Sequence, residues 1–180
     1  MTKPAVKTLA ILGASGHGKI IADIAEQLGF SVSFYDDAYP NKKNIEHWPV
    51  IGTFSDLLNV PITNINVAVA IGHNNTREVK IKTLAKNGYT LPALIHPSAV
   101  ISKYAQIDSG SVIAANVVIN AFAVIGRGCI INTSAIIEHD CKIDDFTHIC
   151  PGTALAGGVC VGRSSWVGIG SKVKQLINIG

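Results

Sequence analysis

The sequence predicts two parts: a small βαβ-type α/β domain over residues 1–90 and a parallel β-helix over residues 91–180. Up to about residue 90, apolar runs that end in glycine or polar clusters alternate with helical patterns. From Ala93 onward, an aliphatic residue recurs at every sixth position. Pro92 and Pro97 lie where one period changes to the other, so the domain boundary is expected there.

The six-residue period is unbroken to the last residue, Gly180. Each block of six has an aliphatic residue in its third place and, with few exceptions, a small residue in its first. The third-place residues are Ile95, Ile101, Ile107, Ile113, Ile119, Ile125, Ile131, Ile137, Ile143, Ile149, Leu155, Val161, Val167, Val173 and Ile179. This pattern is typical of a hexapeptide β-helix, in which each short strand places one branched side chain inside and stacked coils share one core.

The first part predicts alternating strands and helices. In chain order these are a strand at 7–12, a helix over 20–28, a strand at 31–37, an extended piece entering a short helix at 51–58, a strand at 66–72 and a helix at 76–88. Such an order predicts a parallel sheet, and ligands of open α/β sheets bind at the carboxyl ends of the strands.

Three clusters fall at those strand ends. Residues 13–18, GASGHG, place small residues before a helix, where backbone N–H groups can approach phosphate closely; a purely structural turn is the alternative. Asp36 and Asp37 follow the second strand, where an acid can accept hydrogen bonds from a ribose or a base, or form a solvated turn. Residues 72–75, GHNN, end the third run. Together the clusters predict a nucleotide-bearing ligand.

Composition narrows the function classes. A hydrophobic content of 48% with 15% charged residues excludes disorder, and a net charge of +3 spread along the chain gives no support for nucleic-acid binding. The longest apolar run, residues 111–126, is interrupted by asparagines and keeps the six-residue phase, so no membrane span is expected. No signal peptide is recognised, and the four cysteines show no C-x-x-C pair, which favours a cytoplasmic protein with reduced, packed thiols.

The β-helix carries one group suited to acid–base chemistry. Residues 138–140 read Glu-His-Asp at a corner between repeats, and His148 follows half a coil later. A carboxylate on one imidazole nitrogen fixes the tautomer and leaves the other nitrogen to accept a proton. Surface histidines without function are the alternative. A zinc site of the hydratase type would need a third ligand, which the sequence lacks, so no metal is expected. Cys150 as an acyl-carrying nucleophile has little support.

The chain resembles the sugar acyltransferases of the sialic-acid O-acetyltransferase NeuD and bacillosamine N-acetyltransferase PglD group. The resemblance rests on GASGHG, the Asp-Asp pair, AIGHNNTR, ALIHPSAVIS and INTSAIIEHDCKIDDFTHICPGTALAGGVCVG, and it covers essentially the whole chain. It implies a Rossmann-like N-terminal domain that holds a UDP-amino-sugar and a left-handed β-helix. It also implies a homotrimer that binds acetyl-CoA between adjacent β-helices.

The resemblance assigns roles to individual residues. His139 corresponds to the family's base, and Asp140 to the acid that supports it, where the family has Glu. The substrate positions are Ser15, Gly16, His17, Asp36, Asp37, Gly72 and Asn132, and the coenzyme positions are His148, Gly157 and Ile169. Lys172 and Lys174 either meet coenzyme phosphates or are simply solvated. The family continues through further coils, whereas this sequence stops at Gly180 in mid-block, so a truncated C-terminus is expected.

The expected activity is acetyl-CoA-dependent N-acetylation of a UDP-4-amino-4,6-dideoxy sugar for bacterial glycan synthesis. His139 would be the general base of a direct transfer, without an acyl-enzyme. Two alternatives stay open: O-acetylation of a sialic-acid-type hydroxyl, and a catalytically silent trimeric scaffold that binds nucleotide sugars.

Overall fold

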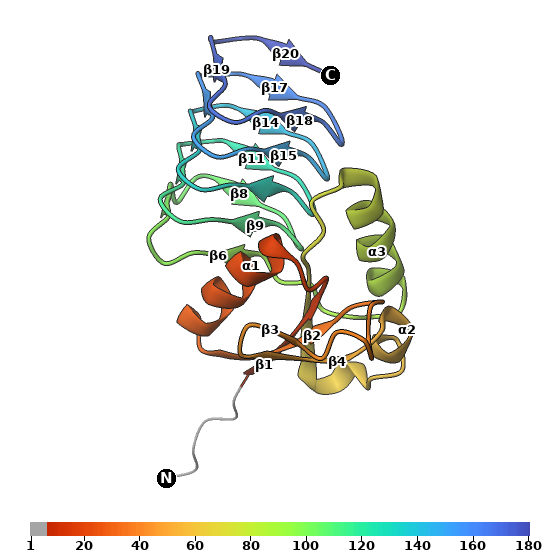
Figure 1. The fold of residues 1–180 in the computed structure, drawn as a ribbon. Helices are drawn as coiled ribbons and strands as arrows, with labels where there is room; N and C mark the ends of the chain where they lie inside the picture. Colours follow the sequence, from red (N-terminus) through yellow and green to blue (C-terminus); the bar gives the residue numbers. More distant parts are fainter. Residues whose placement is uncertain (1–6) are drawn as a thin grey trace. The chain divides into compact units, whose positions relative to one another are not determined.

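A computed structural model describes residues 7–180 of the chain (Figure 1). It contains two compact units. One comprises the chain up to Ile71 together with Lys80–Pro92, and the other comprises Gly72–Val79 together with Ala93–Gly180. The expected combination of an α/β domain and a left-handed parallel β-helix is confirmed. Among the described residues, no helix has the length and apolarity needed to cross a membrane.

The first unit is built on a five-stranded sheet in the order β3-β4-β2-β1-β5. Its strands are β1 (Lys7–Leu12), β2 (Phe30–Tyr35), β3 (Asn44–Ile45), β4 (Trp48–Gly52) and β5 (Ile65–Val69). Only β3 is antiparallel to its neighbour. The central strand β1 ends in four buried residues, as expected of a parallel strand covered on both faces.

Four helical segments accompany this sheet: α1 (Gly16–Gln27), α2 (Phe54–Leu57), the 3-10 turn η1 (Ile62–Asn64) and α3 (Asn74–Lys86). Helix α1 approaches β1 closely, because a Cβ on Gly18 would lie 2.5 Å from the Gly13 carbonyl oxygen and 2.9 Å from the Phe34 ring. Only glycine allows that approach, which sets the helix N-terminus directly after the first strand. Helix α3 is divided between the units: it belongs to the β-helix unit up to Val79.

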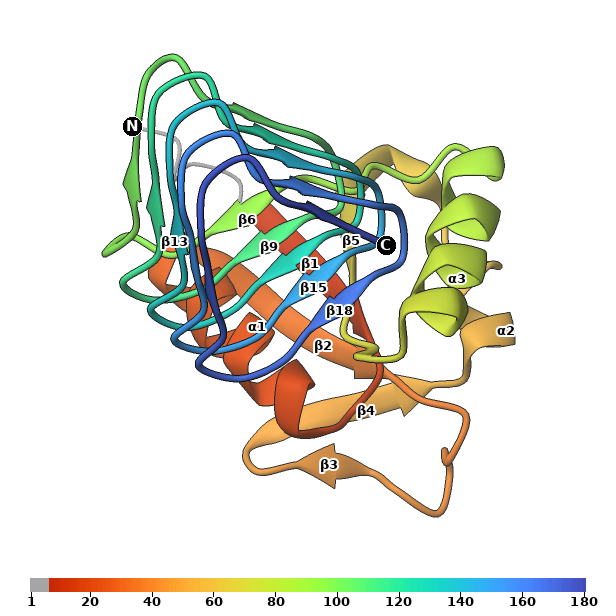
Figure 2. The same cartoon turned by 90° about the horizontal axis from the view of Figure 1, so that it is seen from above.

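The second unit is the β-helix, whose strands β6–β20 are each two residues long. They are Leu94–Ile95, Val100–Ile101, Gln106–Ile107, Val112–Ile113, Val118–Ile119, Val124–Ile125, Ile130–Ile131, Ile136–Ile137, Lys142–Ile143, His148–Ile149, Ala154–Leu155, Cys160–Val161, Trp166–Val167, Lys172–Val173 and Asn178–Ile179. Every third strand joins the same sheet, so three parallel five-stranded sheets result. Viewed from above, the coils overlie one another (Figure 2).

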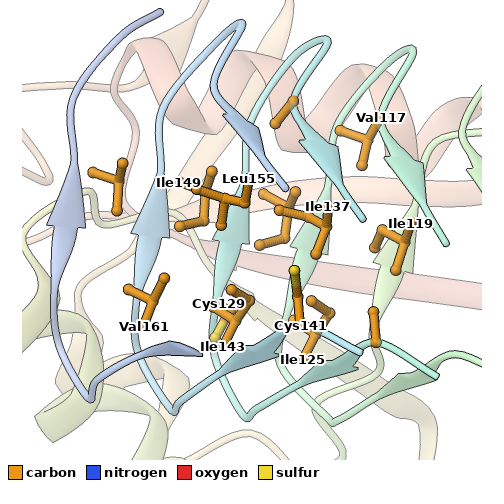
Figure 3. Packing of buried hydrophobic residues seen from close by; sticks show 14 of the residues in the cluster. Val117, Ile119, Ile125, Cys129, Ile137, Cys141, Ile143, Ile149, Leu155 and Val161 are labelled. Atoms are coloured by element: carbon orange, nitrogen blue, oxygen red, sulfur yellow. The ribbon is translucent and has the colours of Figure 1, made fainter. Parts of the chain in front are cut away.

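The third-place aliphatic residues form the core of the β-helix, as predicted from the six-residue period. From Ile113 to Val167 all are buried, and those at the two ends of the stack are partly buried (Figure 3). The small first-place residues Cys129 and Cys141 are also fully buried. Their thiols lie 3.2 Å from carbonyl oxygens fifteen residues further along, and Thr147 and Thr153 make the corresponding hydrogen bonds at 3.0 Å.

Residues eighteen apart stack in columns along the β-helix. Strand pairing shows the register directly, since Val118 pairs with Val100 and with Ile136. Adjacent coils are therefore separated by the spacing of neighbouring strands, about 4.8 Å. Many corners contain a residue with positive φ, among them Phe122 (63°) and Asp140 (61°), which turns the backbone sharply and directs the corner side chain outward. Any two groups in one column are thus a whole number of coils apart.

Candidate active site

His139 and Asp140 form a hydrogen-bonded pair at the corner that follows β13. The imidazole Nδ1 lies 2.8 Å from Asp140 Oδ2, and the two side chains are 64% and 62% exposed. Because a carboxylate accepts, Nδ1 carries the proton and Nε2 is left with its lone pair. The predicted base and acid are therefore placed together, in the tautomer that a general base requires.

Gly157 lies one coil beyond His139 in the same column. A Cβ at this position would lie 2.5 Å from His139 Cε1 and 2.6 Å from Nε2, so only glycine leaves the ring its place. The Gly157 carbonyl accepts from Leu176 N, while its N–H has no hydrogen-bond partner among the residues described. A backbone N–H that makes no other hydrogen bond, beside a candidate general base, can donate to an oxyanion that develops during a reaction.

A cavity of about 300 Å³ opens on this side of His139. It is lined by His139, Asp140, Gly157, Gly158, Gln175 and Leu176. A second cavity, of about 490 Å³, lies on the adjoining sheet β7-β10-β13-β16-β19, where its lining includes Glu138, Lys172 and Lys174. Glu138 immediately precedes His139 and Lys174 precedes Gln175, so residues of neighbouring columns line the two cavities. Sequence reasoning missed Gln175 and Leu176, although both lie 36 residues, or two coils, from His139 and Asp140.

Asn132 and His148 form a separate group at the corner that follows β12. Thr133 N donates to Asn132 Oδ1 at 2.8 Å, which leaves the Asn132 amide to donate to His148 Nε2 at 3.1 Å. His148 is 7% exposed, and its ring lies 4.3 Å from that of Trp166. Its Nδ1 is buried without a hydrogen-bond partner among the described residues.

Burial determines the charge of His148. Desolvation, with a smaller contribution from the Arg77 guanidinium, lowers the pKa of His148 to about 4. The ring is therefore neutral at physiological pH, and it can contact a ligand only as a neutral imidazole. Ile169 lies beyond β18 at this second corner and is 78% exposed. Within one chain, the predicted coenzyme residues His148 and Ile169 are thus at a different corner from Gly157.

Burial disfavours the thiolate form of three cysteines in the β-helix. Burial raises the pKa of Cys129 to about 12 and also raises the pKa of Cys141 and Cys150 above the usual value. Among the described residues, no three histidine, cysteine or acidic side chains are arranged to hold a metal ion.

In the first unit, the loop after β1 is fixed by neighbouring side chains. Asp36 Oδ2 accepts from Ala14 N at 2.7 Å, and Lys42 Nζ donates to the Ala14 carbonyl. Asp36 Oδ1 also accepts from Ala38 N at 2.9 Å. The carboxylate predicted to contact a ribose or a base is therefore already used to shape the glycine loop. Ser15, at the N-cap of α1, makes no capping hydrogen bond with its side chain.

The remaining predicted substrate residues lie as follows. Gly16 is the first residue of α1, and His17 lies in its first turn. Asp37 accepts from Phe54 N at 2.9 Å and lies 3.9 Å from Lys80 Nζ, which in turn lies over the Phe54 ring. Gly72 belongs to the β-helix unit, where its carbonyl accepts from Arg77 at 2.8 Å.

The chain matches known proteins along its length. The family model for the PglD N-terminal domain matches residues 8–84. A UDP-N-acetylbacillosamine N-acetyltransferase of Bacillus subtilis (strain 168) is 35% identical over 116 residues; the match covers 61% of this chain and 52% of the relative, so it spans about half the relative's length.

Two solved structures resemble the whole chain. One is a His-to-Asn variant of perosamine N-acetyltransferase from Caulobacter crescentus in complex with CoA and GDP-perosamine, with a TM-score of 0.91, 32% identity, and 97% of this chain and 83% of that chain covered. The other is the acetyltransferase domain of PglB from Neisseria gonorrhoeae FA1090 in complex with acetyl coenzyme A, with a TM-score of 0.79, 34% identity, and coverage of 96% and 92%. The chain therefore belongs to the PglD-type family of sugar acetyltransferases.

Proposed function

We propose that this chain transfers the acetyl group of acetyl-CoA to the amine of a UDP-4-amino-4,6-dideoxyhexose. The observation that carries the proposal is the His139–Asp140 pair, which faces a cavity beside the unspent N–H of Gly157. A base and an oxyanion donor on the same side of one cavity are what aminolysis of a thioester requires. The names of the relatives support a sugar amine as the acceptor.

The reaction follows from the tautomer of His139. Nε2 accepts a proton from the sugar amine as the nitrogen attacks the thioester carbonyl carbon, and Asp140 stabilises the imidazolium that forms. The carbonyl oxygen becomes an oxyanion, to which Gly157 N–H donates. When the intermediate collapses, the C–S bond breaks and the coenzyme thiolate takes the proton from His139. Transfer is direct: no cysteine is among the residues that line the cavity beside His139, and burial raises the pKa of Cys129 and of Cys150, which makes these thiols poor nucleophiles.

The coenzyme would enter along the larger cavity. Lys172 and Lys174 place two positive charges there, next to the columns of Glu138 and His139, and they are suited to the phosphates of acetyl-CoA. The pantetheine arm would then reach the apolar cavity beside Gly157. The family resemblance adds His148 and Ile169 to this site, with His148 as a neutral ring.

The nucleotide would bind in the first unit. Helix α1 begins at Gly16, on the loop that Asp36 holds in place, and the backbone N–H groups at a helix N-terminus are suited to a diphosphate. Asp37, with a side chain 69% exposed, would contact the ribose or the base. The name of the Bacillus subtilis relative, a UDP-N-acetylbacillosamine N-acetyltransferase, supports uracil.

We further propose that the active form is a homotrimer. The first residues of successive strands in the sheet β7-β10-β13-β16-β19 form an outward-facing row that is mostly apolar. In this row Val100 is 64% and Ile136 is 37% exposed. Burying such a row against another copy would be favourable. The two groups of predicted site residues lie at different corners of one chain, so a neighbouring copy would bring the Asn132 corner of one chain to the His139 corner of another.

Acetyl transfer can be measured directly. The full chain is mixed with acetyl-CoA and one acceptor, and release of the coenzyme thiol is followed, with the product identified by mass spectrometry. We expect turnover with the UDP-4-amino-4,6-dideoxyhexose and competition by free UDP. Turnover only with the GDP-linked sugar would show that the substrate carries GDP and not UDP. Turnover only with a hydroxyl acceptor would favour O-acetylation. Binding of the UDP-sugar without any acetyl transfer would favour a silent scaffold.

A further inference from the structure

The cavity beside His139 is a notch in one corner of the β-helix. Its floor is the glycine pair Gly157 and Gly158, and its walls are the coils on either side, which carry His139 and, opposite, Gln175 and Leu176. Gly158 N donates to the His139 carbonyl at 2.9 Å, and Leu176 N donates to the Gly157 carbonyl at 3.1 Å. The three coils are therefore in register, and the notch exists because the middle coil has no side chain at this corner.

His139 and Leu176 lean over the glycine pair from opposite walls. A Cβ on Gly157 would lie 2.6 Å from His139 Nε2, and a Cβ on Gly158 would lie 2.8 Å from Leu176 Cδ2. Since the two glycines are consecutive, the ring nitrogen and the leucine methyl group lie over neighbouring positions of the same coil. Whatever reacts at Nε2 is therefore close to the side chain of Leu176.

The fold alone does not account for a leucine at position 176. Its φ is 61°, a left-handed conformation that is unfavourable for a bulky side chain, and 77% of the residue is exposed. Phe122 and Phe146 also have positive φ, but their rings are packed: Phe146 is 1% exposed, and Phe122 stacks on Tyr104 with ring centroids 5.2 Å apart. A leucine that keeps this conformation without being buried by its own chain points to contact with a ligand.

Four groups surround the carbon that is attacked in the proposed reaction. The oxygen is directed to Gly157 N–H, the nitrogen of the acceptor to His139 Nε2, and the sulfur to the larger cavity that contains Lys172. The alkyl group takes the direction that remains, over Gly158 towards Leu176. Among the described residues that line the notch, Leu176 has the only aliphatic side chain, so it is the natural contact for a methyl group.

We propose that Leu176 selects the length of the transferred acyl group. The methyl group of the acetyl thioester packs against the leucine side chain, whereas each added methylene has to displace it. The notch, about 300 Å³, is small for a ligand site and must also receive the sulfur and the end of the pantetheine arm. This inference rests on the proposed acetyl transfer and names the residue that restricts its donor to the two-carbon thioester.

The test compares acetyl-CoA, propionyl-CoA and butyryl-CoA as donors for the full chain, with thiol release as the readout and the same amino-sugar acceptor throughout. Wild type should prefer acetyl-CoA to propionyl-CoA by roughly 10- to 200-fold in kcat/KM, the range that one methylene group can give. Leu176→Ala should lower this preference at least about tenfold, and butyryl-CoA should become a donor. Leu176→Met, which keeps an apolar side chain of similar volume, should retain the preference.

Leu28→Ala is the matched control, because it removes the same atoms from a leucine of the first unit that is 39% exposed. Its ratio of kcat/KM values should equal that of wild type. The ratio compares two donors on one protein, so a general loss of activity in a variant does not affect it.

The outcomes separate the two proposals. A wild-type chain that transfers no acyl group from any of the three thioesters overturns the proposed function and the selection by Leu176 with it. An active wild type that uses acetyl-CoA and propionyl-CoA equally well overturns the selection alone, as does a Leu176→Ala variant with the wild-type preference. So does a Leu176→Ala variant that changes the oligomeric state in light scattering, because the leucine would then be a contact between copies.

Discussion

Two corners of the same β-helix differ in how they use their polar groups. At the corner of His139, the side chains of the predicted base and of Asp140 are exposed, and the Gly157 N–H has no hydrogen-bond partner among the described residues. At the corner that contains Gly128 and Phe146, the side chain of Arg77 from helix α3 is 1% exposed and donates to both carbonyl oxygens, at 2.8 and 2.7 Å. Both corners come from the same repeat, so the repeat itself does not specify chemistry.

The two corners differ in how many of their hydrogen-bond donors and acceptors are paired. Arg77 also donates to Asn74 Oδ1 at 2.7 Å and to the Gly72 carbonyl at 2.8 Å, so its guanidinium is surrounded by neutral acceptors. Burial lowers its pKa to about 10, and it remains charged at neutral pH. A corner with every donor and acceptor paired stabilises the fold, whereas a corner with unpaired groups is available to a substrate. Four substitutions test this comparison.

The largest effect is expected from His139→Ala. Loss of the general base should lower kcat by roughly 10²–10⁴-fold. Because the side chain is mostly exposed, the free energy of unfolding should change by less than about 0.5 kcal/mol. Thiol-release kinetics and urea unfolding measure the two quantities. Near-normal kcat would contradict the assignment of the base.

Arg77→Leu should act mainly on stability, whereas His139→Ala should act mainly on kcat. Removal of the guanidinium leaves buried carbonyl groups without donors, which should lower the free energy of unfolding by roughly 3–5 kcal/mol. Arg77→Lys should recover only part of the loss, since an ammonium group lacks the planar set of donors. Arg127→Ala, at an exposed arginine of the same β-helix, is the control. Urea midpoints that match wild type would show that this corner does not contribute to stability.

Gly157→Ala should separate activity from stability at the first corner. The added methyl group would lie 2.5 Å from His139 Cε1, so the ring must move while the backbone can stay. A displaced base should reduce kcat about 10- to 100-fold with little change in unfolding. Gly168→Ala is the matched control, because its Cβ would meet only Ser171 Oγ at 3.9 Å. Equal kcat values for the two variants would refute this role for Gly157.

The smallest effect concerns pH and His148. The folded chain protonates His148 only near pH 4, whereas the unfolded chain does so near 6.5, so unfolding takes up a proton between these values. Stability should therefore fall as the pH drops below about 6.5, by on the order of 2 kcal/mol at pH 5. His148→Gln should remove this part of the pH dependence. Urea unfolding of the wild type and of His148→Gln at pH 7 and pH 5 measures the loss of unfolding free energy between the two pH values. An equal loss in both proteins would contradict the prediction.

The β-helix was predictable because its period is local and strict. Fifteen aliphatic third-place residues required no knowledge of the surrounding fold, and the adjacency of His139 and Asp140 in sequence made their pairing predictable. The hydrogen bonds of the polar residues in the first place of each block could not be predicted from the sequence. Thr147 and Thr153 satisfy their hydroxyls on carbonyl groups of the next coil, a distance of fifteen residues that the six-residue phase does not reveal.

Contacts between distant segments could not be predicted from the period. Nothing in the sequence marks Arg77 as the side chain that enters a β-helix corner fifty-one residues later. The clearance that Gly157 gives His139 and the stacking of Tyr104 on Phe122 do have a signal, a spacing of eighteen residues. That signal becomes interpretable only once three strands per coil are established. In the first unit, the use of Asp36 to fix the glycine loop depends on backbone geometry that no local pattern encodes.

The column register has a consequence for how this enzyme family can diverge. An insertion or deletion within the β-helix preserves all three faces only if it comprises whole coils, that is, multiples of eighteen residues. The distance between two groups in one column, such as His139 and Gly157, can therefore change only in steps of about 4.8 Å. Evolution can adjust a site on the surface of the β-helix finely by exchanging side chains, but it can lengthen such a site only by adding one complete coil.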